Sequence, residues 1–158
     1  MNEIPRNPPR NPDEDALDLE TFFPYQITVL TKQVSNSLAK TYVDRFGITI
    51  PEWRVMAALG RYPNATASHV VRHTGLDKVQ VSRAVALLAD KGHVARRPDP
   101  EDRRNAFINL TTRGRTTYRE IVPVARAYEE RLLATITPEQ RRMLNAVLDE
   151  LTARAEEL

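Results

Sequence analysis

The segment TASHVVRHTGLDKVQVSRAVALLADKG, residues 66–92, limits most strongly what this chain can fold into. Thr66 can cap a helix of about two turns, and Gly75 supplies a sharp turn after it. Asp77 can cap a second helix, with a glutamine three residues later to complete a capping box. Gly92 is placed to end that helix. A short helix, a glycine turn and a longer helix predict a helix-turn-helix.

The second helix, 78–91, has two chemically different faces. At about 100° per residue, one face gathers the apolar side chains that we expect to be buried: Val81, Ala84, Val85 and Leu88. The outer side should present Lys78, Val79, Gln80, Ser82, Arg83 and Ala86. Arginine can pair with guanine, glutamine with adenine, and valine can touch a thymine methyl group. We therefore expect these six residues to bind DNA; the alternative is a plain helical hairpin with a mixed outer face.

A predicted β-hairpin follows, with the sequence RRPDPEDRR at its tip (residues 96–104). The runs on either side, 93–97 and 105–110, flank a turn, and the second run alternates in the manner of a half-buried strand. A hairpin placed directly after a reading helix is a wing, and its arginines can enter a minor groove. The tip residues that we expect to contact DNA are Asp102, Arg103 and Arg104, with the aspartate orienting an arginine. The alternative is a hairpin closed by local salt bridges.

Helical periodicity marks the rest of the chain. From Ile27 onward, apolar residues recur every three or four positions, which predicts one long helix ending near Gly47. Thr49 and the glutamate three residues later form a capping box for the next helix. After Gly114 the helical period returns, and Thr137 opens a last helix with proline at its first position. The end helices carry more apolar surface than a small domain needs, which favours dimerisation.

These elements predict a mainly α fold with a small β-wing: a winged helix-turn-helix plus long N- and C-terminal dimerisation helices. Residues 1–16, rich in proline and poor in apolar side chains, are expected to form a flexible tail. Residues 17–158 are expected to form a single domain. Within it, 17–48 and 115–158 are the expected dimerisation helices, and 49–114 are the expected DNA-binding lobe.

The charge distribution agrees with a nucleic-acid partner. The net charge is only +2, yet residues 61–120 hold twelve Lys or Arg against six Asp or Glu. The first twenty residues reverse this balance, with six acids against two arginines. A basic middle between neutral or acidic ends favours a localised polyanion-binding surface. The chain has no cysteine, no secretory pattern and no apolar run of membrane-spanning length, so we expect a cytoplasmic protein without a membrane partner.

Enzymatic and metal chemistry find little support in the residues. We find no nucleophile–base pair and no glycine-rich phosphate loop, so we expect neither an enzyme nor a cofactor. His69 and His73 have the four-residue spacing of helical metal ligands. However, no glutamate follows the first histidine as in a zinc-protease helix, and His93 lies beyond the reading helix. We therefore expect no metal site, and expect His69 and His73 to face solvent or DNA phosphates.

The order of elements, together with DPEDRRNAFINLTTRG, resembles the MarR family of winged helix-turn-helix transcriptional regulators. The wing signature of that family, Asp-x-Arg followed by alternating aliphatic residues and Leu-Thr, matches Asp102, Arg104, Ile108, Leu110 and Thr111. LDKVQVSRAVALLADKG resembles the recognition helix of the family. The resemblance covers about residues 20–158. It implies a homodimer whose first and last helices interlock and whose two wings bind pseudo-palindromic double-stranded DNA.

The resemblance also implies a small-molecule effector, often aromatic or anionic. FFPYQ and IPEWRVMAALGRYP resemble the branch of the family that responds to aromatic acids, including hydroxycinnamoyl-type thioesters. The candidate ligand-binding residues are Phe22, Phe23, Tyr25, Trp53 and Arg54. The alternative for these aromatic residues is a place in the core. The expected function is a sequence-specific regulator, and in particular a repressor released by an aromatic acid or its CoA thioester; the alternative is an architectural protein that binds DNA without sequence preference.

Overall fold

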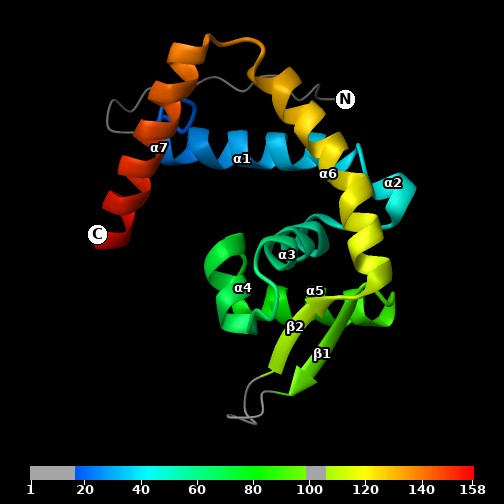
Figure 1. Ribbon diagram of the computed structural model, residues 1–158. Coiled ribbons are helices and arrows are strands. Elements are labelled where there is room, and N and C mark those ends of the chain that lie inside the picture. Colours follow the sequence, from blue (N-terminus) through cyan, green and yellow to red (C-terminus); the bar gives the residue numbers. More distant parts are fainter. Residues whose placement is uncertain (1–16, 99–105) are drawn as a thin grey trace, which may run out of the picture. The chain divides into compact units, whose positions relative to one another are not determined.

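The computed structural model describes residues 17–98 and 106–158 and is mainly helical, with one two-stranded sheet in the described part (Figure 1). The elements in chain order are α1 (Phe23–Ala39), α2 (Val43–Phe46), α3 (Ile50–Arg61), α4 (Ala67–Thr74), α5 (Lys78–Asp90), β1 (Val94–Pro98), β2 (Ala106–Leu110), α6 (Thr112–Leu133) and α7 (Pro138–Glu157). The predicted fold class, mainly α with a small β-wing, is confirmed. The chain divides after Asn36 into two compact units. No helix within the described ranges is long and apolar enough to cross a membrane.

The prediction of one helix from Ile27 to Gly47 is wrong, because the chain turns between α1 and α2. Thr41 donates both its backbone N–H and its hydroxyl to the Leu38 carbonyl, at 3.0 and 2.6 Å. The turn allows Tyr42, only 1% exposed, to enter the core, where its ring lies 5.7 Å from that of Trp53. Burial of a large aromatic side chain therefore outweighs the local helical pattern.

The three helices of the lobe that is predicted to bind DNA begin at the predicted caps. Glu52 accepts the Thr49 N–H at 2.7 Å at the start of α3, and the Thr66 hydroxyl accepts the His69 N–H at the start of α4. Asp77 caps α5 in a capping box. Gly75, with φ of 64°, takes the left-handed conformation between α4 and α5. The predicted helix-turn-helix is confirmed in its order, caps and turn.

The two strands form an antiparallel wing that is also tied to the loop before α4. Val94 pairs with Leu110 at one end of the sheet, and Pro98 pairs with Ala106 at the other. Ala65 forms an isolated bridge with Ile108 on the free side of β2. Beside it, the side-chain amide of Asn109 donates to Asn64 Oδ1 at 2.9 Å, and the Asn64 N–H donates to Asn109 Oδ1 at 2.8 Å.

Helix α6 begins earlier than the sequence pattern indicated, at Thr112 instead of after Gly114. The Thr111 hydroxyl caps it by accepting the Gly114 N–H at 3.0 Å. Gly114 therefore lies in the first turn, where a Cβ would overlap the carbonyl oxygen of His93. The absence of a side chain lets α6 approach the backbone that leads into β1.

A buried ion pair joins α3 to the end of α5. Glu52 is fully buried, and its Oε1 accepts a hydrogen bond from Lys91 Nζ at 2.6 Å. Lys91 Nζ also donates to the Gly47 carbonyl at 2.7 Å. Burial of Glu52 opposes its ionisation, but the hydrogen bonds from Lys91 and Thr49 outweigh burial and lower the pKa of the carboxyl below its usual value.

Helix α7 buries none of its residues. Its apolar side chains are each at least 41% exposed: Met143, Leu144, Val147, Leu148, Leu151 and Leu158, the last lying just beyond the helix. In the N-terminal unit, the apolar side chains of Phe22, Phe23, Tyr25, Ile27 and Leu30 are likewise exposed. Exposed apolar stripes of this length are typical of surfaces that another chain covers.

The Lys91–Glu52 pair provides the first testable prediction. Lys91→Met should lower the free energy of unfolding at neutral pH by about 2 kcal/mol, which is less than the usual cost of about 3–5 kcal/mol for breaking a buried pair, because the Lys91 side chain is 37% exposed. Because the folded-state pKa of Glu52 is lowered, its stabilising contribution is present above the unfolded-state pKa and is lost as pH falls through the folded-state value.

Urea denaturation from neutral pH down to about pH 3 would measure both effects. Lys91→Met should flatten the acid-side loss of stability, whereas Lys32→Met, which removes an exposed ammonium, should leave the pH profile of the wild type unchanged. Equal acid-side slopes in wild type and Lys91→Met would contradict the role given to the pair.

Candidate nucleic-acid interface

The predicted division of α5 into a buried and an exposed face is present in the structure. Val81, Ala84, Val85 and Leu88 are each at most 2% exposed. The candidate DNA-binding residues on the outer side are all exposed: Lys78, Val79, Gln80, Ser82, Arg83 and Ala86. Val79 is 76% exposed, so packing against the described part of the chain does not account for an apolar side chain at this position. An outer face with an arginine, an amide, a small residue and an exposed methyl-bearing side chain suits the edges of base pairs.

Gln80 has two roles that use the same atom. Its side-chain Oε1 accepts the Asp77 N–H at 3.1 Å, while Asp77 Oδ1 accepts the Gln80 N–H at 2.7 Å. A bidentate contact with adenine needs this same Oε1 to accept from the adenine amino group. Gln80 can therefore offer DNA its amide N–H groups, and in a bidentate contact Oε1 would accept a second hydrogen bond through its other lone pair.

The wing carries arginine on both of its faces. Residues directly opposite each other in an antiparallel pair lie on the same face, and successive residues alternate. Arg96 pairs with Ile108, which is buried, so Arg96 lies on the face turned toward the lobe. Arg97 pairs with Phe107 on the other face. The predicted contacts of the tip, Asp102, Arg103 and Arg104, lie outside the described residues and stay predictions.

Two of the candidate effector residues, Trp53 and Arg54, line a pocket between α3 and α4 of about 360 Å³. The Trp53 ring stacks on Tyr118 at 5.9 Å, and Arg54 donates to the Thr74 carbonyl at 3.4 Å. Burial raises the pKa of Tyr42 to about 12, although the nearby Arg54 charge acts in the opposite direction. Tyr42 is therefore a neutral hydroxyl at physiological pH. The other candidates, Phe22, Phe23 and Tyr25, belong to the N-terminal unit and are exposed.

The same pocket is lined by residues that sequence reasoning did not select, among them Arg61, Tyr62 and His73. Arg61 lies over the Tyr62 ring at 5.7 Å from its centroid. The signal available in the sequence was RYP at the end of α3, which is part of the segment IPEWRVMAALGRYP but supplied no candidate residue. With Trp53 and Arg54, these residues give the pocket aromatic walls and two guanidinium groups, a combination that suits a planar anion.

His69 does not face solvent as expected. Its ring lies 4.8 Å from that of Tyr62 and 4.4 Å from that of His73, and its Nε2 is buried without a hydrogen-bond partner. His73, in contrast, is exposed. Within the described ranges, no group of three or more potential metal ligands comes together. The two histidines therefore contribute ring contacts that fix α4 against the end of α3.

His93 is the other buried histidine, at the start of the wing. It is 4% exposed. Burial is the first cause that lowers its pKa, and the positive charges of Arg113 and Lys91 lower it further, while Glu52 acts in the opposite direction. His93 is accordingly a neutral ring, and its backbone carbonyl accepts the Thr111 N–H at 3.0 Å. Its backbone joins α5 to the start of α6.

A capped reading helix with an exposed polar face, preceded by a short helix and followed by a β-wing, defines a winged helix-turn-helix DNA-binding protein. Residues 46–105 match the MarR family. The DNA-binding lobe of this chain is similar to that of MarR-family transcription regulators, and regulators of this family bind DNA. The resemblance inferred from the wing and the reading helix is thereby confirmed, as is the expectation of a regulator instead of an enzyme.

Individual relatives agree with this assignment. A helix-turn-helix transcriptional repressor of Mycobacterium tuberculosis is 29% identical over 123 residues, which are 78% of this chain and 85% of that protein. A MarR/EmrR family transcriptional regulator of Acinetobacter sp. ADP1 is 26% identical with a TM-score of 0.83, covering 90% of this chain and 100% of its own. CouR of Rhodococcus jostii RHA1, whose crystal structure contains p-coumaroyl-CoA, shares the fold at 21% identity, with a TM-score of 0.73 over 86% of this chain and 95% of its own.

Proposed function

We propose that this protein is a homodimeric, sequence-specific, cytoplasmic repressor that binds a pseudo-palindromic operator and is released by a small aromatic or anionic effector. The observation that carries the proposal is the outer face of α5, where Val79 and Arg83 are exposed on a helix whose other face is fully packed. Exposed side chains of this kind add little packing to the lobe but match the chemistry of the major groove. The name of the mycobacterial relative supports the repressor role.

The proposed dimer rests on the apolar stripe of α7. Met143, Leu144, Val147, Leu148 and Leu151 lie within about 140° of one another around the helix axis and are all exposed. A second copy of the chain is the occupant that two-fold symmetry and a pseudo-palindromic operator require. Two reading helices would then contact half-sites about one helical turn apart.

The proposed effector site is the pocket between α3 and α4. Trp53 offers an aromatic wall, while Arg54 and Arg61 offer positive charge on the same lining. An aromatic carboxylate would stack on the ring and pair with a guanidinium. The p-coumaroyl-CoA bound by CouR, a protein of the same fold, supports this chemical class.

Arg83→Ala tests sequence-specific binding. DNA fragments selected by the wild type at two salt concentrations should contain one palindrome, and the variant should lose preference at one base position in each half-site, at a cost of about 1–3 kcal/mol. Arg131→Ala removes an exposed arginine from the last turn of α6 and serves as the control. Diffuse enrichment that disappears with salt would instead identify an architectural protein that grips phosphates.

Leu148→Asp tests the dimer. The substitution would place a charge in the proposed interface, so sedimentation should show monomers at concentrations where the wild type is dimeric. Asn145→Asp adds the same charge about 130° away from the centre of the stripe and should leave the dimer intact. An unaltered dimer in Leu148→Asp would refute this interface.

Arg54→Met tests the effector pocket. Trp53 is the only tryptophan of the chain, so its fluorescence reports on this pocket directly. Titration with benzoate or p-coumaroyl-CoA should quench the wild type and weaken operator binding, and the variant should need about tenfold or more of either compound. Arg126→Met, on the exposed part of α6, is the control. If wild type and Arg54→Met respond identically, the effector does not bind here.

A further inference from the structure

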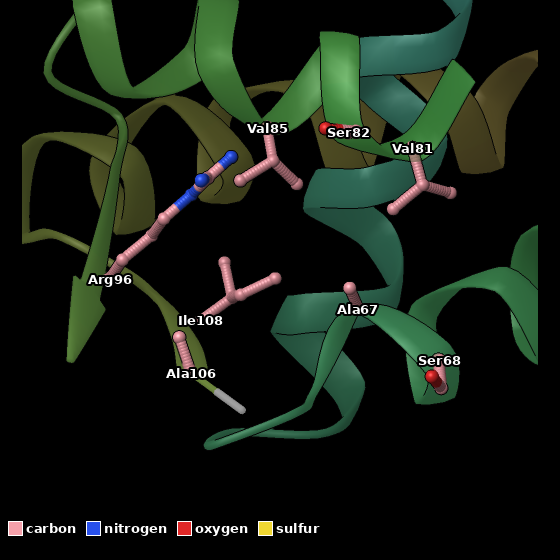
Figure 2. A pocket seen from close by; sticks show the side chains of 8 residues that line it. All are labelled: Ala67, Ser68, Val81, Ser82, Val85, Arg96, Ala106 and Ile108. Carbon is pink, nitrogen blue, oxygen red and sulfur yellow. The ribbon is translucent and has the colours of Figure 1, made fainter. Parts of the chain in front are cut away.

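A second hollow, of about 210 Å³, lies between α4, α5 and the wing strands. Its floor is apolar, formed by Val81 and Val85 of α5 and Ile108 of β2, while Ser68, Ser82 and Arg96 add polar groups. Figure 2 shows the Arg96 side chain extending from β1 toward Val85. Among the described residues that line the hollow, none is acidic. The lining therefore favours an anion with an apolar part.

Strand register explains why Arg96, and not its neighbour, lines this hollow. Arg96 lies opposite Ile108, a floor residue, whereas Arg97 lies opposite Phe107 on the other face of the wing. The two arginines are adjacent and carry the same charge, yet they point to opposite sides of the sheet. Both are exposed. The strand thus assigns one guanidinium to the hollow and keeps the other away from it.

The hollow also adjoins the reading face. Ser82 lines it and directly precedes Arg83 on α5. A helix in the major groove lies between two sugar-phosphate backbones, because the groove is only about 12 Å wide. On the wing side of α5, this hollow offers a surface to the nearer backbone.

We propose that the hollow seats one backbone unit of the operator, a phosphodiester with its adjoining deoxyribose. Arg96 pairs with the phosphate, the hydroxyl of Ser82 donates to one of its oxygens, and the sugar carbons contact the apolar floor. The seat carries no base information and fixes the register of α5 along the groove, which makes Arg96 a positioning residue. The inference rests on the proposed operator binding.

The test compares Arg96→Met with Arg97→Met on the selected operator, using the full-length protein. Arg96→Met should weaken binding by about tenfold, reduce the salt slope by about one, and leave the base preferences unchanged. Operators carrying one neutral methylphosphonate at each backbone position in turn identify the phosphate involved. At one position the replacement should weaken the wild type and Arg97→Met but not Arg96→Met, because that variant has already lost the contact.

The outcomes separate the two levels of the proposal. If selection recovers no operator, the proposed function fails, whatever the hollow does. If an operator is bound but Arg96→Met has the methylphosphonate profile of the wild type, the seat is refuted. If Arg96→Met proves unstable in urea, Ser82→Ala replaces it in the test. Ser82→Ala should lose a weaker contact with the same phosphate than Arg96→Met does.

A free anion is the other source of the same chemistry. Inorganic phosphate added without DNA would shift the Arg96 side-chain Nε–H resonance if the hollow bound free anions. That shift, with no operator phosphate coupled to Arg96, would overturn the proposal in favour of a small-molecule site. Coupling between one methylphosphonate position and Arg96→Met, together with no coupling between that position and Arg97→Met, would support the seat.

Discussion

The buried carboxylate of Glu52 sets the geometry on which the DNA-binding lobe depends. A fully buried carboxylate is costly unless its oxygens are paired, and here Thr49 and Lys91 pair them. Lys91 is the residue that ends α5, and it also binds the carbonyl of Gly47. One ion pair therefore joins the start of α3, the end of α2 and the end of the reading helix, so that α5 cannot shift along α3 without exposing a charge to an apolar interior.

This anchoring leaves the outer face of α5 available for the proposed base contacts. The Asp77 capping box holds the first turn, Lys91 holds the end, and four small or aliphatic side chains pack the inner face. Because the caps and the inner face hold α5 in place, the exposed side chains of Val79 and Arg83 are available for contacts with DNA. Gln80 is the exception, since its side chain completes the cap and also lies on the reading side. Base readout requires a rigid helix whose surface residues are not needed to hold it in place.

Local signals in the sequence were sufficient for the caps, the glycine turn and the faces of α5, since each depends on residues within one or two turns of each other. Contacts between distant residues were not readable. Glu52 was interpreted as part of a capping box, but its partner Lys91 is 39 positions away. Burial of Tyr42 in the core ends the first helix early. Gly114 lies in the first turn of α6 because the backbone of His93 comes close to it. Arg96 and Arg97 are indistinguishable in the sequence until the register places Ile108 opposite one of them.

The loop between α3 and α4 gives the proposed effector pocket a physical connection to the wing. Tyr62 lines the pocket, and Asn64, two residues later, exchanges two hydrogen bonds with Asn109 of β2. Ala65 adds a backbone hydrogen bond, accepting the Ile108 N–H at 2.8 Å. A ligand that displaces Tyr62 therefore acts on a segment bonded to the strand that carries the floor of the Arg96 hollow. Coupling of this kind needs no long-range rearrangement, because pocket, loop and wing share consecutive residues of one short connection.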